Sequence, residues 1–157
     1  MSRRFEQATE TLEAAVQLLH TGHDRDAINR AYYSMFYAGL ALLATRMVGA
    51  SKHSGVISLF GKHFVKTGEF SPEAGRHLRE AFDLRQKSDY REDFDPTHEQ
   101  AVEIVSHAGA FLEEAKKVWD MQTVSDVLPG GGFASRPSSF ELQQPAETGN
   151  ESDAGSD

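Results

Sequence analysis

Apolar residues recur at helical spacing through most of this chain, and this period constrains the fold more than any other feature. Residues 1–124 repeat apolar side chains every three to four positions and show no convincing alternation of the kind that a β-strand needs. The repeats fall into five segments, each with one apolar stripe and one polar face. None of these could stand alone in water, so they must pack on one another. The pattern predicts an all-α fold, an antiparallel bundle of four or five helices.

Glycines and proline pairs mark where the predicted helices end and begin. The first three segments are expected to end at or near Gly22, Gly49 and Gly68. A proline at the first helical position is favourable, and an acid or serine before a helix can cap it. The predicted start signals of the second, fourth and fifth segments are Asp24, Ser71-Pro72 and Asp95-Pro96.

The composition changes near residue 125. Pro129 is followed by three glycines, and beyond them come proline, serine, glutamine and acids with few apolar anchors. Such a segment cannot bury enough apolar area to offset its ordering entropy. We therefore predict one helical domain over residues 1–124 and a disordered acidic tail over residues 125–157.

The net charge of −8 argues against a broadly basic nucleic-acid-binding surface. Residues 125–157 hold six acids and one base, which leaves 18 acids and 15 bases in the helical part. That part is close to balanced, so a local basic cleft remains compatible with the composition.

The chain has no cysteine, and it has neither an apolar leader nor an apolar run long enough to cross a bilayer. We expect a cytoplasmic protein without a membrane partner. A di-iron bundle would need Glu-x-x-His pairs, which do not occur, and His77 and His107 are interpreted as isolated histidines at the surface or edge. We therefore expect no metal and no cofactor.

An aromatic run over residues 29–37 is the first feature that packing alone does not explain. Asn29 and Arg30 open it, and four aromatic side chains follow within about two turns. Tyr33 and Tyr37 should share one helix face, as should Tyr32 and Phe36. The run predicts either an aromatic core with bonded hydroxyls or a face that stacks a base or nucleotide.

Arg85 is the second such feature, because its spacing from the apolar residues of the fourth segment places it near the inward-facing side of that helix. A desolvated guanidinium needs an acceptor, and Asp89 stands one turn later, followed by Tyr90. One interpretation is a structural ion pair that closes the helix end. The other is a guanidinium held at the rim of a helical groove, where it meets a phosphate while Asp89 and Tyr90 steer it.

The third feature is the polar stretch from Ser51 to Gly55, which contains His53, at the start of the third segment. Polar groups at a helix N-terminus either cap the helix or favour an anion there.

Together these three stretches resemble the HEPN family (higher eukaryotes and prokaryotes nucleotide-binding), most of all its small stand-alone prokaryotic members. The resemblance covers about residues 5–120. It implies an antiparallel helical bundle, a homodimer, a nucleotide or RNA site along the dimer groove, and a minimal nucleotidyltransferase as partner in a toxin–antitoxin-like pair. On this resemblance the candidate catalytic residues are Arg85, Asp89 and Tyr90, and the candidate nucleotide- or RNA-binding residues are Asn29, Arg30, Tyr33, Tyr37 and His53.

The sequence departs from the family at one point that matters for chemistry. HEPN ribonucleases carry a histidine that is separated from the motif arginine by four to six intervening residues, which would fall at Tyr90, Arg91 or Glu92. Cleavage through a ribose hydroxyl needs a group that moves a proton near neutral pH, and histidine suits this best. His53 or His98 would have to be brought in by folding.

The expected function is therefore a nucleotide- or RNA-binding protein that works with a nucleotidyltransferase. Two alternatives stay open: a metal-independent ribonuclease toxin that uses Arg85, and a non-catalytic dimeric helical scaffold.

Overall fold

The computed structural model describes residues 2–49 and 52–127, with side chains to residue 122. Within these residues the chain is helical and contains no β-strand. The all-α prediction is thus confirmed, and the predicted tail lies outside the described residues from residue 128 on. The elements are α1 (Arg3–His20), α2 (Asp24–Ala44), α3 (His53–Phe60), a π-helical turn η1 (Gly61–Val65), α4 (Pro72–Tyr90) and α5 (His98–Val127).

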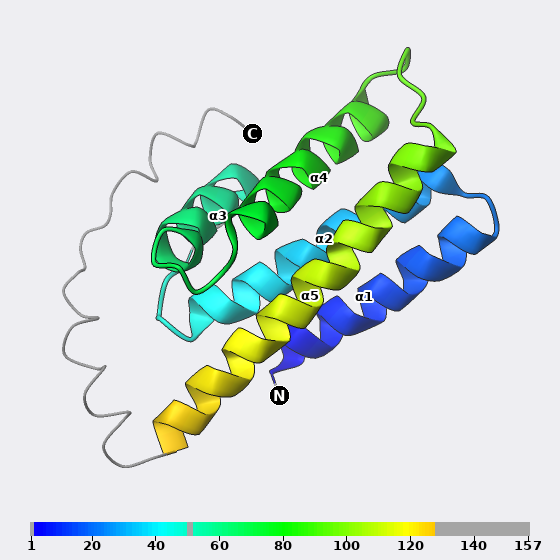
Figure 1. Cartoon of the computed structure of the whole chain (residues 1–157). Coiled ribbons are helices and arrows are strands. Elements are labelled where there is room, and N and C mark those ends of the chain that lie inside the picture. The colour runs from blue at the N-terminus through cyan, green and yellow to red at the C-terminus, as the bar shows by residue number, and fades with distance from the viewer. Residues whose placement is uncertain (1, 50–51, 128–157) are drawn as a thin grey trace.

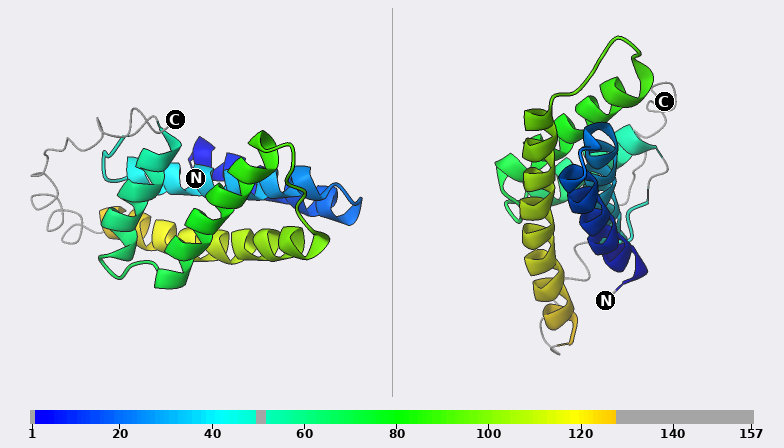
Figure 2. Two further views of the ribbon diagram at one scale, coloured as in Figure 1. Left: turned by 90° about the horizontal axis from the view of Figure 1, so that it is seen from above. Right: turned by 90° about the vertical axis from the view of Figure 1, so that its right-hand side faces the viewer.

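Helix α2 is the centre of the bundle. It packs against α1, α3, α4 and α5, and the long helices reverse direction from each one to the next (Figure 1). The shorter α3 and η1 lie beside α4 at one end of the bundle (Figure 2). The antiparallel arrangement expected from the short connections is therefore confirmed.

The core is built on the apolar stripes that the sequence predicts. On α2, buried residues such as Ile28, Ser34 and Phe36 come from different sides of the helix, because other helices cover it on several sides. A cluster of aromatic rings joins the end of α3 to α5, where the ring of Phe60 lies 4.8 Å from Phe70 and 5.3 Å from Phe111. Tilted and edge-on rings at such distances contribute beyond their buried area.

The predicted helix ends are confirmed at Gly22 and are wrong at Gly49. Gly22 adopts a φ of 82°, and the amide of the next residue donates to the carbonyl of Leu18. This is the usual glycine C-cap. Helix α2 ends earlier than predicted, at Ala44, because Met47 takes the left-handed conformation with a φ of 58°. The amide of Val48 then donates to the carbonyl of Leu43.

The predicted helix starts are likewise mixed. Ser71 caps α4 and Pro72 is its first residue, as predicted. Asp24 is the first residue of α2 rather than its cap. Helix α5 begins at His98, two residues later than Pro96 suggests, because Thr97 and Gln100 form a reciprocal capping box.

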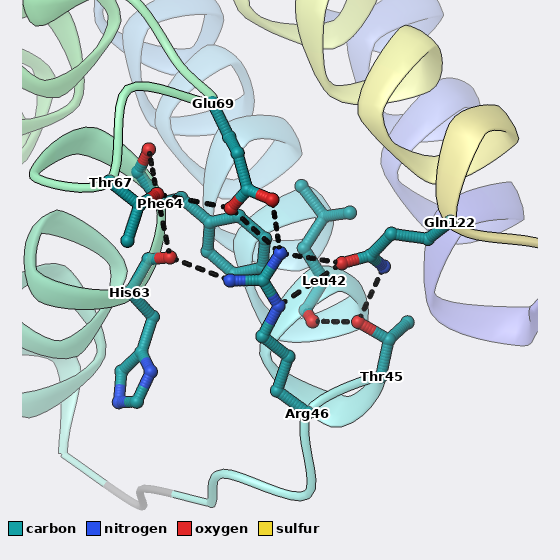
Figure 3. A network of polar contacts seen from close by, with 8 residues as sticks. All are labelled: Leu42, Thr45, Arg46, His63, Phe64, Thr67, Glu69 and Gln122. Carbon is teal, nitrogen blue, oxygen red and sulfur yellow. Dashed lines mark hydrogen bonds and ion pairs between the residues drawn. The ribbon is translucent and has the colours of Figure 1, made fainter. Parts of the chain in front are cut away.

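A polar network around Arg46 ties three parts of the bundle together (Figure 3). Its guanidinium donates to the carboxylate of Glu69 at 2.6 Å, to the carbonyl of His63 at 2.8 Å and to the side chain of Gln122 at 2.9 Å. The same guanidinium lies 4.2 Å from the ring centre of Phe64. The end of α2 is thereby fastened to η1 and α5.

Candidate functional site

Arg85 lies near the C-terminal end of α4 with its guanidinium largely enclosed, since the residue is 5% exposed. The ring centres of Tyr32, Tyr33 and Phe82 lie 5.0, 5.5 and 5.7 Å from its Cζ. The carboxylate of Asp89 lies 3.7 Å from Nη1. The expectation that this guanidinium stands open at the rim of a groove is therefore wrong, because rings and a carboxylate cover it.

The enclosed guanidinium is poorly satisfied. Arg85 Nε is buried without a hydrogen-bond partner among the described residues, and the distance to Asp89 is longer than a hydrogen bond. Its contact with His53 Nδ1 is long, at 3.4 Å. Buried cations are normally paired and hydrogen-bonded. Arg85 thus retains donor capacity that an anion could use.

Asn29 connects Arg85 to a second guanidinium. Its amide nitrogen donates to the carboxylate of Asp89 at 3.0 Å, and its amide oxygen accepts from Arg30 Nε at 3.1 Å and Nη2 at 2.9 Å. The guanidinium of Arg30 lies 5.2 Å from the ring centre of Tyr33, which also faces Arg85. Two guanidiniums therefore converge on one tyrosine ring, and Asn29 and Asp89 hold them in place.

His53 is the first residue of α3, and the fold brings it to Arg85 from a different helix. Its Nδ1 lies 3.0 Å from the hydroxyl of Tyr32 and 3.4 Å from Arg85 Nη2. The imidazole stacks on the ring of Phe36 with centroids 4.3 Å apart. A guanidinium can only donate, so these contacts favour the tautomer in which Nδ1 accepts. Ser51, which we placed in the same polar stretch, lies outside the described residues.

The tyrosines of α2 and α4 differ in exposure. Tyr32 is fully buried and belongs to the core, whereas Tyr33 and Tyr37 are half-buried, with their ring centres 5.8 Å apart. The predicted shared face of Tyr33 and Tyr37 is therefore confirmed. Tyr90 is 72% exposed, and its ring centre lies 5.9 Å from Arg85 Cζ.

The buried hydroxyl of Tyr32 is a polar partner of His53, in agreement with the expected aromatic core with bonded hydroxyls. Sequence reasoning missed one polar residue beside this cluster. Ser88, one turn beyond Arg85, is 3% exposed, and its hydroxyl has no partner among the described residues. A serine on the inward face of a helix is the only signal that could have indicated it.

Other polar side chains gather away from this cluster. His98 pairs with Asp24 at 2.9 Å, where α5 and α2 begin. His77 and His107 are not isolated as expected: their rings stack 3.6 Å apart between α4 and α5. Burial lowers the pKa of His77, and the neighbouring His107 lowers it further.

A shallow hollow of about 410 Å³ lies between α3, η1 and α4 and is lined by Phe60, Val65 and Arg79 among others. None of the predicted site residues lines it. Within the described part of the chain no group of three or more histidine, acid or cysteine side chains could hold a metal ion. No helix in that part has the length and hydropathy needed to span a bilayer.

This chain is similar in sequence to several known proteins. The chain is 41% identical over 113 residues to a Methanocaldococcus jannaschii protein named "putative toxin", a match that covers 72% of this chain and 84% of the relative. A second protein of that organism with the same kind of name is 36% identical over 74% of this chain and 80% of its own length. A "UPF0332 protein" of Thermotoga maritima is 36% identical over 71% of this chain and 84% of its own length.

The model of the HEPN domain matches residues 1–118, which include α1 to α4, most of α5 and the whole Arg85 cluster. This chain belongs to the HEPN domain family.

Proposed function

We propose that this protein binds RNA or a nucleotide through its phosphate and acts as the toxin-like member of a pair with a minimal nucleotidyltransferase. It works as a cytoplasmic homodimer. The family assignment supports the proposal, as do the two Methanocaldococcus jannaschii relatives named as putative toxins. The observation that carries it is the pair of guanidiniums, Arg30 and Arg85, that converge on the ring of Tyr33.

The geometry supports phosphate as the group that is bound. Guanidinium forks match phosphate oxygens in shape and charge. Arg85 keeps an unused Nε donor, and Arg30 uses Nε and Nη2 on Asn29. A phosphate reaches Arg85 by taking the place of the Asp89 carboxylate, whose side chain is 24% exposed. The half-buried Tyr33 and Tyr37 then offer ring faces to an unpaired base.

Titration of a fluorescently labelled single-stranded RNA by anisotropy tests this binding. Replacing Arg85 with alanine should weaken binding about tenfold to a hundredfold, because one buried charge-assisted hydrogen-bond donor is lost. The RNA affinity of Arg85→Lys should lie between those of the wild type and Arg85→Ala, since an ammonium keeps the charge but cannot bind phosphate in the bidentate manner of a guanidinium. Arg79→Ala is the matched control, because it removes an exposed arginine from the same helix.

A second candidate, the non-catalytic scaffold, is favoured by the burial of Arg85 beside Asp89. It predicts equal RNA affinity for the wild type, Arg85→Ala and Arg79→Ala, together with a lower melting temperature for Arg85→Ala alone. That result would exclude RNA binding at Arg85.

The partner is tested separately, by co-expression with the nucleotidyltransferase encoded nearest to this chain. A complex that survives affinity purification and gel filtration supports the pairing. Elution of this chain without the nucleotidyltransferase contradicts it.

A further inference from the structure

We propose that the shallow hollow between α3, η1 and α4 binds a segment of this same chain, residues 140–147, from the part of the sequence that follows α5. Residues 128–157 lie outside the described part of the chain. The inference does not depend on RNA binding, because none of the predicted site residues lines the hollow. It assigns an intramolecular docking surface to a part of the bundle that does not include Arg85.

The hollow has an apolar lining from three elements. Its volume is about 410 Å³, and the buried Ile57, Phe60 and Leu78 line it together with the half-buried Val65. An apolar side chain that enters such a hollow removes apolar surface of its own and of the protein from water, which favours binding. The lining therefore suits one or two apolar side chains.

Two arginines add positive charge to the same hollow. Arg76 and Arg79 both line it, and both are exposed on α4. Neither guanidinium has an ion pair or hydrogen bond with another described residue. Carboxylates are the side chains that guanidiniums bind best. The hollow therefore fits a segment in which apolar side chains stand next to an acid.

The sequence after α5 contains a segment of this kind. Phe140, Glu141 and Leu142 place an acid between two apolar residues, and Glu147 follows. In an extended segment residues 140 and 142 lie on one side and residue 141 on the other. Phe140 and Leu142 then enter the hollow, while the long arginine side chains reach Glu141 from the outer side. Residues 128–157 hold five acids and one base, so their charge complements the arginines.

The end of α5 lies beside one wall of the hollow. The guanidinium of Arg46 donates both to the side chain of Gln122 on α5 and to the carbonyl of His63 in η1, which also lines the hollow (Figure 3). Helix α5 ends at Val127, and Phe140 follows 13 residues later. A run of that length spans up to about 43 Å when extended and about 20 Å on average as a random coil. The segment can therefore reach the hollow.

Attachment to α5 favours this occupant over a separate molecule. Ten residues line the hollow, whereas a standard protein–protein interface uses about 20–30 residues a side. A site this small gives weak affinity, which leaves it mostly empty at micromolar concentrations of a free partner. A segment joined by a short linker has an effective concentration on the order of millimolar, so weak affinity suffices.

Introduced cysteines can report the docking in the full chain, because the sequence contains no cysteine. The hollow pair combines Ser58→Cys, at an exposed residue that lines the hollow, with Gln143→Cys. The control pair combines Thr9→Cys with Gln143→Cys. Thr9 is exposed on α1, one turn from Phe5, whose ring lies 5.5 Å from that of Trp119 near the end of α5.

Equilibration with glutathione gives the effective concentration of each pair of thiols. The value for the hollow pair should exceed that for the control pair about tenfold or more, because docking holds residue 143 beside the hollow. Equal values would overturn the proposal. Disulfide-linked dimers in place of an intramolecular bond, seen by mass without reductant, would also overturn it, since the occupant would be a second copy.

Further substitutions in the hollow pair test the contacts. Arg76→Glu should lower the effective concentration about threefold to tenfold, and Glu141→Arg in the same protein should restore most of the loss. Phe140→Ser should lower it similarly. Phe133→Ser is the matched control, because Phe133 has no acid beside it, and it should change nothing. Thermal melts establish that each variant is folded. An effective concentration that neither Arg76→Glu nor Phe140→Ser lowers would overturn the assignment of this segment to the hollow.

Discussion

The amide nitrogen of Asn29 donates to the carboxylate of Asp89 across 3.0 Å, and this bond joins α2 to the last turn of α4. Asp89 also faces Arg85 at 3.7 Å, so one carboxylate serves residues of two helices. It occupies the position that we propose for an RNA phosphate. The competition between the two anions can be measured.

Replacing Asp89 with asparagine should raise RNA affinity about threefold to tenfold at low salt. The substitution removes a charge that repels the phosphate, and an amide can still accept from Asn29. The gain should shrink with added salt. Anisotropy titration at two salt concentrations measures it, with Asp83→Asn as control, because Asp83 is an exposed acid on the same helix. Equal gains in the two variants would mean that only net charge matters.

Acidification should destabilise the fold before the carboxylates titrate. Burial lowers the pKa of His77 below 6.5, and the stacked His107 and Arg76 lower it further against the opposing Glu80 and Glu73. The unfolded chain therefore binds more protons below about pH 6.5 than the native one. The neutral ring of His77 should make its full contribution to the free energy of unfolding above that pH. The contribution should decline as the pH falls below it.

Urea unfolding at pH 7.5, 6.5 and 5.5 tests this dependence. His77→Gln should reduce the dependence of the free energy of unfolding on pH. Part of the dependence should remain because of His63, whose pKa is also lowered by burial and by the neighbouring Lys62. His20→Gln, an exposed histidine on α1, should leave the slope as in the wild type. Identical slopes for wild type and His77→Gln would contradict the assignment.

Arg46→Ala should lower the free energy of unfolding by about 1–2 kcal/mol, because it removes the donor that partly buried acceptors in η1 and α5 share. The wild-type guanidinium bonds to Glu69, Gln122 and the carbonyl of His63. Chemical denaturation measures the loss. Arg79→Ala, with no ion pair in the described part of the chain, should change stability by less than about 0.5 kcal/mol. A loss for Arg46→Ala no larger than this would show that the network is not stabilising.

Met47→Gly should stabilise the protein by about 0.5–1 kcal/mol. Met47 has a φ of 58° and is 93% exposed, so glycine relieves a strained backbone and loses almost no packing. A rise in the urea midpoint with an unchanged slope is the expected result. Met121→Gly, another exposed methionine but inside α5, should instead be destabilising, because glycine is unfavourable in a helix interior.

Local patterns in the sequence were enough to predict the helices. Apolar spacing identified the five segments, and Gly22 and Ser71-Pro72 marked a true end and a true start. These features depend on residues within one or two turns, so they need no knowledge of the fold. The same reasoning misplaced the end of α2 and the start of α5. The left-handed backbone at Met47 ends α2 before Gly49, and the capping box of Thr97 and Gln100 starts α5 after Pro96.

The tertiary structure alone decided which polar groups meet. The sequence singled out Arg85 and His53, but only the packing of α3 across α2 and α4 brings them within 3.4 Å. It also decided that Arg85 is enclosed, with Asn29 and Asp89 linked across 60 residues. Helical period determines which face of a helix is apolar. How each helix is rotated and where it crosses its neighbours depends on the fit of the whole core, which no local stretch of sequence contains.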